Sequence, residues 1–282
     1  MNSEVAIWVR VHRLLVLSLI AGVSTAITHA DLLDAITASG NFGTVNPSTG
    51  GFTTISTGTV PVSSGIDKTP GGVLYEYDEL NHLYTIDPTT GATTLVGSGS
   101  IPGFSFGSFL TSAGLTNGEY FAINFNGDLY SINLMTGATT KIGNTGINLE
   151  NSSNTGVCES TGLAGSSTTL YYAAALPQGS GCSSNQLYSI DPTTASATLI
   201  GPTTGANHIV GAAYDSGTLY AFTYQTPQIF TLDTTMATAS FQTNTSEFII
   251  GAVPMAPVPE VSSVLLLGSA LVGVAAFYRR AA

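Results

Sequence analysis

The chain repeats one short pattern of apolar and polar positions. Leu83–Gly97 reads L-Y-T-I-D-P-T-T-G-A-T-T-L-V-G, and close copies begin at Leu129 and Leu187. More divergent copies begin at Phe42 and Ile229. Each copy has four apolar, aromatic or β-branched positions, then a polar turn, then a second short run. This pattern predicts a strand, a tight turn and another strand.

The polar turn contains residues whose chemistry closes a turn. Asp87 can accept hydrogen bonds from the backbone ahead of it, Pro88 fixes φ, and Gly91 tolerates the left-handed conformation. A calcium site needs several converging oxygen ligands, which one carboxylate per turn does not supply. We therefore interpret Asp87 as a turn former, together with its counterparts Asn133, Asp191 and Asp233.

The spacing of the copies predicts a β-propeller. The second positions of successive copies, from Gly43 through Tyr84, Tyr130 and Tyr188 to Phe230, are 41, 46, 58 and 42 residues apart. Periods of about forty residues built from strands are typical of propeller blades. Further β-rich runs precede the copies and give up to four strands per blade, the innermost rich in Gly and Ala. Examples are residues 73–77, 104–109, 120–123, 170–173, 209–214 and 219–222.

The two ends of the repeat region are expected to share a sheet. Residues 31–36 begin a blade that lacks its inner strand, whereas residues 247–253 form a surplus strand after the last copy. Completing the first blade with this strand would close the ring and remove exposed sheet edges. We therefore predict an all-β propeller of five four-stranded blades over residues 31–253. An open β-solenoid and a six-bladed ring with one degenerate blade are the alternatives.

Composition and charge indicate an extracellular protein that does not bind nucleic acid. Only 8% of residues are charged, and glycine occurs 32 times; this suits an extracellular all-β chain. The net charge is −11, and within 31–253 the only bases are Lys68 and Lys141, so a basic surface for nucleic acid is missing. Cys158 and Cys182 both fall in the longest period, and in an oxidising compartment we expect them to form a disulfide that fixes this insertion. Two buried thiols are the alternative.

Residues 1–30 have the pattern of a secretory signal peptide. Arg10 and Arg13 precede the apolar run 14–21, and small residues lead to Ala26 and Ala30. The run is too short for a stable membrane span. We expect cleavage after one of these two alanines and an N-terminal signal helix.

The C-terminal end has the pattern of a membrane tail. A Pro-rich linker, residues 254–260, leads into residues 261–282, of which 261–277 carry no charge. A helix of this length is at the lower limit for crossing a bilayer. Arg279 and Arg280 are expected to stay on the cytoplasmic side, which leaves the repeat region outside. An ordinary single-span anchor and a buried core helix are the other interpretations.

This tail resembles the PEP-CTERM sorting signal of Gram-negative bacteria. Pro259 and Glu260 match the first two signature positions, and Val261 stands where the family has a second proline. The resemblance covers about the last 25 residues and implies processing by the membrane enzyme exosortase. It also implies location at the cell envelope or outer surface, with the tail held at least transiently in the inner membrane, and association with exopolysaccharide or biofilm matrix. The repeats resemble those of many secreted bacterial propeller-like proteins.

Candidate chemistry is sparse. A glycoside hydrolase needs two carboxylates that flank the scissile bond, and weak candidates for such a catalytic pair are Asp67, Glu159 and Asp215, near the expected inner strands. We predict no metal or cofactor site, because His82 and His208 are isolated and no metalloprotease, serine hydrolase or phosphate-binding motif occurs. The acidic run Glu76, Asp78 and Glu79 is interpreted as a solvated hairpin tip. The recurring tyrosines at 75, 84, 130, 171, 188 and 220 are interpreted as core between blades.

These observations predict a secreted or envelope-anchored propeller that binds matrix polysaccharide and is not an enzyme. The alternative is an extracellular carbohydrate-active enzyme, a glycoside hydrolase or lyase, on the same scaffold. The lining of the central channel distinguishes the two. Small residues there favour binding or scaffolding, whereas carboxylates about 5–10 Å apart favour hydrolysis.

Overall fold

The computed structural model describes residues 32–61, 63–78, 82–98, 111–149, 161–178 and 181–255. The predicted signal peptide, nearly all of the C-terminal linker, the sorting tail, Glu79, Cys158 and Glu159 lie outside these residues, as does the side chain of Cys182. The described residues form twenty strands and no helix. The strands are β1 (Leu33–Thr37), β2 (Phe42–Val45), β3 (Phe52–Ser56), β4 (Ser63–Lys68), β5 (Leu74–Asp78), β6 (His82–Ile86), β7 (Thr93–Ser98), β8 (Thr111–Gly114), β9 (Tyr120–Ile123), β10 (Asp128–Ile132), β11 (Thr139–Asn144), β12 (Thr161–Gly165), β13 (Leu170–Gln178), β14 (Gly181–Ile190), β15 (Ala197–Pro202), β16 (Ile209–Asp215), β17 (Thr218–Thr223), β18 (Gln228–Leu232), β19 (Ala239–Asn244) and β20 (Ile249–Pro254).

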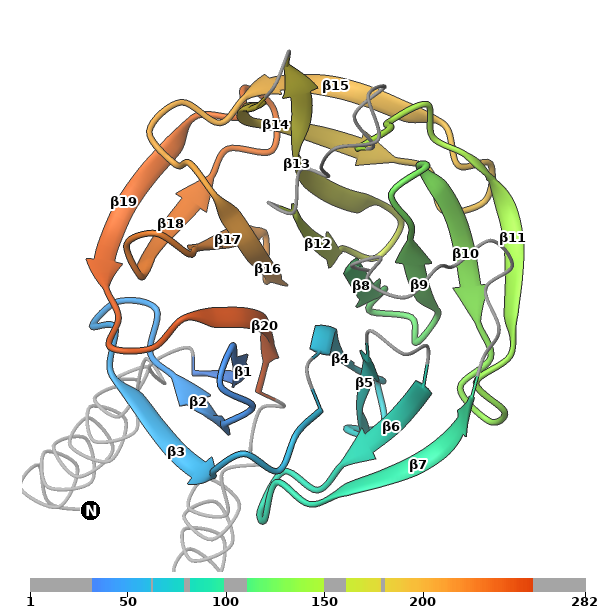
Figure 1. The fold of residues 1–282 in the computed structure, drawn as a ribbon, viewed down its shortest axis with the longest axis vertical. Coiled ribbons are helices and arrows are strands. Elements are labelled where there is room, and N and C mark those ends of the chain that lie inside the picture. The colour runs from blue at the N-terminus through green and yellow to red at the C-terminus, as the bar shows by residue number, and fades with distance from the viewer. Residues whose placement is uncertain are drawn as a thin grey trace, which may run out of the picture. The chain divides into compact units, whose positions relative to one another are not determined.

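The strands form five four-stranded antiparallel sheets arranged around one axis (Figure 1). The chain is a five-bladed β-propeller. From the axis outward, blade 1 consists of β20, β1, β2 and β3, and blades 2 to 5 take β4–β7, β8–β11, β12–β15 and β16–β19. The open solenoid and the six-bladed ring, kept as alternatives, are therefore wrong.

The predicted closure of the ring is confirmed. The C-terminal strand β20 pairs with β1 in antiparallel register, with Leu33 opposite Pro254 and Ile36 opposite Gly251. The last strand of the described residues is thus the inner strand of the first blade. Because a sheet joins the two ends, opening the ring would expose both β1 and β20.

The inner strands are rich in small residues because neighbouring backbones nearly touch. A Cβ atom on Gly162 would lie 2.9 Å from the carbonyl carbon of Gly211, and a Cβ on Gly211 would lie 2.9 Å from the backbone of Ile250. The expectation of Gly- and Ala-rich inner strands is confirmed, although the prediction for blade 3 was misplaced. Its inner strand is Thr111–Gly114, because its small side chains fit where large ones would not, and residues 104–109 lie outside the described part.

Each repeat copy folds as the third and fourth strands of a blade, joined by the predicted turn. In the second blade Asp87 Oδ1 accepts hydrogen bonds from the Thr89 and Thr90 amides at 2.8 and 3.2 Å. The fifth turn residue has positive φ in every copy, 68° at Gly91. The interpretation of Asp87 as a turn former is confirmed, and equivalent bonds are made by Asn46, Asn133, Asp191 and Asp233.

One prediction follows for these turns. Asn133 Oδ1 accepts hydrogen bonds from the amides of Met135 and Thr136 at 2.9 and 3.1 Å. We expect Asn133→Ala to lower the free energy of unfolding by about 1 kcal/mol, as for other lost side-chain caps. Asn133→Asp, which keeps the acceptor, should stay close to wild type in urea unfolding. Equal losses in both variants would contradict the role of the acceptor.

The fifth turn residue also fits against the last repeat position of the preceding blade. Ala195 and Ala237 face Gly143 and Gly201, and a Cβ on Gly143 would lie 3.0 Å from the Ala195 methyl carbon. Where the preceding blade instead carries a side chain, as at Ser56, the turn residue is glycine, as at Gly91. One such pair occurs at each of the five contacts between neighbouring blades: Ser56–Gly91, Gly97–Gly137, Gly143–Ala195, Gly201–Ala237 and Thr243–Gly50. In no pair do both members carry a side chain, so blade contacts depend on matched sizes.

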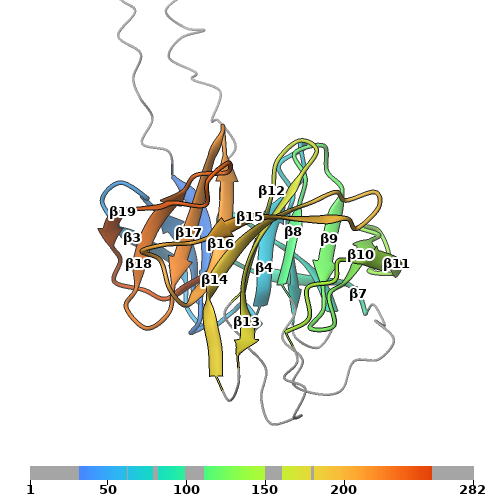
Figure 2. The ribbon, with the colours of Figure 1, turned by 90° about the horizontal axis from the view of Figure 1, so that it is seen from above.

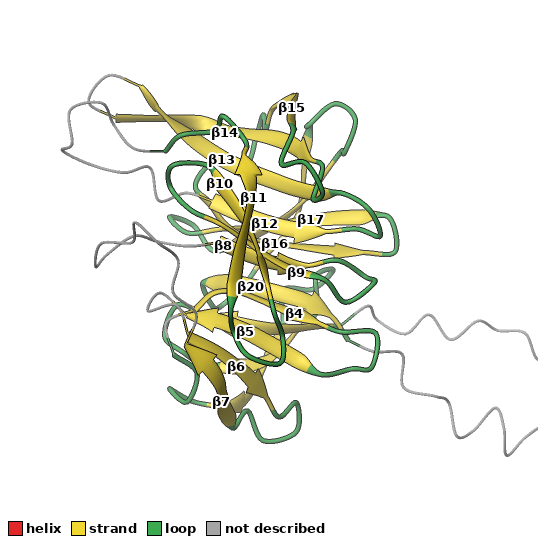
Figure 3. Cartoon of the chain, turned by 90° about the vertical axis from the view of Figure 1, so that its right-hand side faces the viewer, coloured by secondary structure: helices red, strands yellow, loops and turns green. Residues whose placement is uncertain are grey.

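The long period in blade 4 is partly a long hairpin. Its strands β13 and β14 contain 9 and 10 residues, against four to seven in the other strands, and they extend beyond the rest of the ring (Figures 2 and 3). Cys182 lies in β14, near the tip of this hairpin. The predicted bond to Cys158 stays a prediction.

Tyrosines pack between the blades, largely as predicted. Tyr130 and Tyr188 are buried. Tyr84 is half-buried, and Tyr75, Tyr171 and Tyr220 are half-buried with their rings against the hydrophobic clusters between blades. All six lie on the second or third strand of their blades, so none of them is on an inner strand.

Candidate functional site

The candidate site is a cavity at one mouth of the central channel. It has a volume of about 270 Å³. Its lining residues lie at or near the C-terminal ends of the inner strands β4, β8, β12, β16 and β20. All five contribute to the wall. Much of the lining is small, namely Gly72, Gly114, Ala164, Gly165, Ala212, Ala213 and Ala252.

Asp67, one of the three predicted carboxylates, lies in the wall of this cavity. It sits near the end of β4 and is half-buried. Its Oδ1 accepts a hydrogen bond from the Lys68 amide, and its Oδ2 accepts one from the Gly114 amide on blade 3, both at 2.6 Å. Burial raises the pKa of Asp67 to about 7, although these two amides and the Lys68 charge act in the opposite direction.

The lack of a side chain at Gly114 explains why the Asp67 carboxyl group on blade 2 can lie so close to the backbone of blade 3. A Cβ on Gly114 would lie 3.0 Å from Asp67 Cγ. Such a distance is shorter than a normal carbon–carbon contact, so a side chain at position 114 would displace the carboxyl group. The small residue at the end of β8 is therefore part of the site.

Lys68, the other charged residue of the wall, is already paired. Its Nζ donates to Asp34 Oδ2 at 2.6 Å and to the Pro254 carbonyl oxygen at 3.1 Å. Both charged side chains are largely buried, with 10% and 3% of the Lys68 and Asp34 side chains exposed. This pair links β4 to both β1 and β20. It therefore spans the closure of the ring, and the Asp34 carboxylate offsets the lysine charge while two of the three N–H donors are in use.

One aromatic side chain completes the wall. Tyr214, near the end of β16, lines the cavity and is half-buried. Its ring stacks on that of Tyr171 from blade 4, with centroids 5.6 Å apart and an interplanar angle of 17°. The stacking holds Tyr214 in place. Thr69 and Thr116 add side-chain hydroxyl groups.

The three predicted carboxylates do not gather in the described part of the site. Asp215 follows Tyr214 but is not among the cavity-lining residues; it accepts a hydrogen bond from Ser216 Oγ at 2.9 Å. Glu159 lies outside the described residues. Asp67 is thus the only carboxylate found in the described wall, and the second carboxylate that hydrolysis requires is not seen there.

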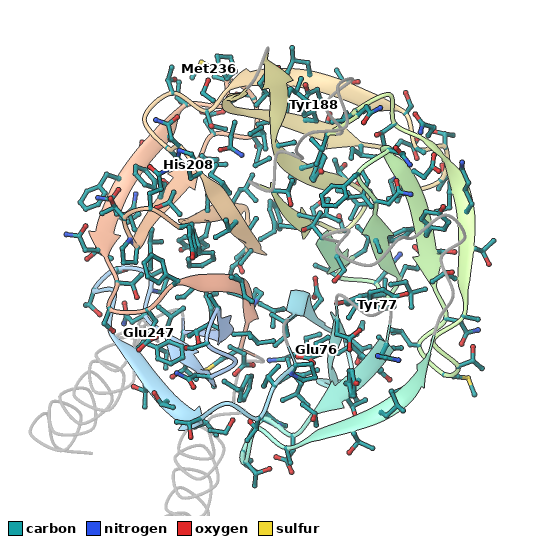
Figure 4. All side chains as sticks on the ribbon, in the orientation of Figure 1. Glu76, Tyr77, Tyr188, His208, Met236 and Glu247 are labelled. Atoms are coloured by element: carbon teal, nitrogen blue, oxygen red, sulfur yellow. The ribbon has the colours of Figure 1, made fainter. Side chains whose placement is uncertain are left out.

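The structure contradicts the prediction of a solvated hairpin tip in blade 2. Glu76 is 0% exposed and Asp78 is 3% exposed; Figure 4 shows Glu76 and Tyr77 within blade 2. The reason is that β5 is the second strand of its blade and is covered by both neighbouring blades. His82, predicted to be isolated, contacts Asp78, with Nδ1 3.0 Å from Oδ2.

Glu76 is unusual because its carboxyl group is fully enclosed. Within the part of the chain that the structure describes, neither oxygen makes a hydrogen bond. Burial raises the pKa of Glu76 to about 8, and the nearby Asp78 charge adds to the effect. The group therefore carries a proton at neutral pH. The sequence pattern could not reveal that this carboxyl group is buried, since the run E-Y-D-E has the composition of an exposed turn.

The described residues contain neither a metal site nor a membrane-spanning helix. Among them, no group of three or more His, Cys, Asp or Glu side chains is placed to hold a metal ion. In the same part of the chain, no helix is long and apolar enough to span a bilayer.

Comparison with known proteins adds little to these observations. No family model matches the sequence, and no curated protein matches it. A similar solved chain comes from a crystal structure of a nidogen/laminin complex. It shares 8% sequence identity, with 80% of this chain and 98% of that chain covered and a TM-score of 0.48. A likeness this distant gives no information on function.

Proposed function

We propose that this protein is an exported, non-enzymatic propeller that binds extracellular polysaccharide at the mouth of its channel. The observation that carries the proposal is the wall of the mouth cavity. It combines many small residues and one fixed tyrosine with a carboxyl group, Asp67, whose two oxygens are both held by backbone amides. A concave site with apolar surface and few fixed polar groups is typical of ligand binding.

The proposed location rests on the sequence of the two ends. Residues 1–30 would direct export, and the tail 261–282 would be recognised by an exosortase-like enzyme at the envelope. The tail would hold the protein in the inner membrane until it is processed, after which the propeller would remain with the exopolysaccharide or biofilm matrix. Neither end belongs to the described residues, so this part of the proposal depends on the resemblance of the tail.

Export and sorting can be tested in the cells that make the protein. We expect the mature chain to begin at residue 27 or 31 and to be recovered from the envelope or the medium. Changing Pro259 and Glu260 together to alanine should leave the tail uncut and the protein in the inner membrane. N-terminal sequencing would locate the start of the mature chain, and intact mass would show whether the tail has been removed. A cytoplasmic chain that keeps its first residues would overturn the proposal of export.

A carbohydrate-active enzyme is the second candidate, because one observation favours it. Asp67 has a pKa of about 7 in a cavity, and a protonated carboxyl group is what a general acid requires. The full-length chain, purified in detergent, should be incubated with exopolysaccharide from the same cells. Retention of the polysaccharide without new reducing or unsaturated ends would support binding. Release of such ends, lost in Asp67→Asn, would support an enzyme instead.

A further inference from the structure

The shape of the mouth cavity restricts how a polymer can enter. Its wall is contributed by the C-terminal ends of the inner strands of all five blades, which surround the axis. Such a wall encloses a bowl, whereas the interior of a polysaccharide needs a groove open at two sides. The volume of about 270 Å³ suits roughly one sugar ring or a molecule of similar size. A chain end can therefore enter, and a mid-chain segment cannot.

The charges of the wall restrict the ligand further. The Lys68 ammonium group is occupied by Asp34 and the Pro254 carbonyl oxygen. The remaining charged group found in the described wall is Asp67, which is either neutral or negative. An anionic ligand would meet a lysine whose charge is already offset by Asp34, and above the pKa of Asp67 it would meet a like charge. Uronate, sulfate and phosphate groups are poorly suited to this site.

The remaining wall matches an uncharged sugar. A sugar ring has apolar C–H faces and a rim of hydroxyl groups. Tyr214, fixed by its stacking on Tyr171 at 5.6 Å, provides an aromatic surface, and alanines on β12, β16 and β20 provide small apolar surfaces. Asp67 can accept further hydrogen bonds, because a carboxylate has about four lone-pair sites and two are used by amides.

We infer that the mouth cavity binds the uncharged terminal sugar of a polysaccharide, with the sugar against Tyr214 and a hydroxyl group directed to Asp67. This inference rests on the proposed function and names the ligand class for the same site. It assigns Tyr214 as the main aromatic contact.

The test uses the full-length chain in detergent and three probes of defined composition. They are linear oligosaccharides of neutral hexoses, linear oligosaccharides of uronic acids, and a cyclic neutral oligosaccharide, which has no chain end. Titration calorimetry with wild type should show binding to the linear neutral probe alone. Tyr214→Ala should weaken this binding about tenfold or more, whereas Tyr214→Phe should retain it.

The matched control is Tyr224→Ala. Tyr224 is 52% exposed, and its ring is 5.0 Å from that of Phe248 at the other end of the inner strands, so its loss should leave binding unchanged. Thermal unfolding would establish that each variant is folded. Preferred binding of uronic acid or cyclic probes, or equal losses in Tyr214→Ala and Tyr224→Ala, would overturn this inference but keep polysaccharide binding. If wild type bound none of the three probes and also failed to bind the native exopolysaccharide, both proposals would be overturned.

Discussion

Glu76→Gln is expected to stabilise the protein at neutral and alkaline pH. The carboxyl group of Glu76 is fully enclosed and has a pKa of about 8, raised from 4.5 by burial and by the nearby Asp78. Glutamine is close in size and cannot ionise. We expect the free energy of unfolding at pH 7 to increase by about 3 kcal/mol, with the variant close to wild type near pH 4.5.

The sign of this change in stability follows from the pH at which the folded chain and the unfolded chain each release the proton of Glu76. Below about pH 4.5, Glu76 is protonated in both the folded and the unfolded chain. Between this pH and about 8, the unfolded chain has lost the proton and the folded chain keeps it, so folding takes up a proton and becomes less favourable as pH rises. Above about pH 8 the folded state contains a buried, ionised carboxylate and the loss is complete. Glu76→Gln should remove this decrease in the free energy of unfolding with rising pH.

Urea unfolding at several pH values from 5 to 9 would measure the effect. The matched control is Glu119→Gln, since Glu119 is exposed and bonded to the Asn117 side chain at 2.7 Å; its stability should follow the wild-type pH profile. If Glu76→Gln ran parallel to wild type over the whole range, the buried carboxyl group would not be the source of the pH dependence.

The fold could be predicted because its main signals are local and repeated. The L-Y-x-I run gives the third strand, the D-P-T-T-G turn gives the hairpin, and the surplus strand at 247–253 gives the closure. The strand and the hairpin depend on residues a few positions apart, whereas the closure, which pairs Leu33 with Pro254, followed from counting one missing strand at the start and one surplus strand at the end. The copies reinforce each other, so the blade count followed from their number.

The candidate site could be predicted only in part because it depends on contacts between blades. Asp67 was proposed from its place near an inner strand, but its bond to Gly114 joins residues 47 positions apart. The Lys68–Asp34 pair likewise links two blades, with 34 positions between its members. Neither spacing follows from the repeat. The burial of Glu76 was missed for the same reason, since a polar run on a second strand resembles an exposed turn until the neighbouring blades are placed.

Gly91→Ala is expected to lower the free energy of unfolding by about 3 kcal/mol. Gly91 has a φ of 68°, where an alanine costs about 1 kcal/mol or more. Its new methyl carbon would also lie 2.7 Å from Ser56 Cβ on the preceding blade, and overpacking of this kind costs about 1–3 kcal/mol. The midpoint of urea unfolding should fall without a large change in slope.

The decisive measurement is a double-mutant cycle with Ser56→Gly. In the double variant, glycine faces alanine, as Gly143 faces Ala195 in the native chain. The steric part of the loss should be recovered, which leaves about 1 kcal/mol from the left-handed alanine and a coupling energy of about 1–2 kcal/mol. Ser56→Gly alone also loses the hydrogen bond between Ser56 Oγ and Thr59 Oγ1 at 2.7 Å, so the cycle must subtract this single effect. Additive losses would mean that matched sizes at the blade contacts do not stabilise the ring.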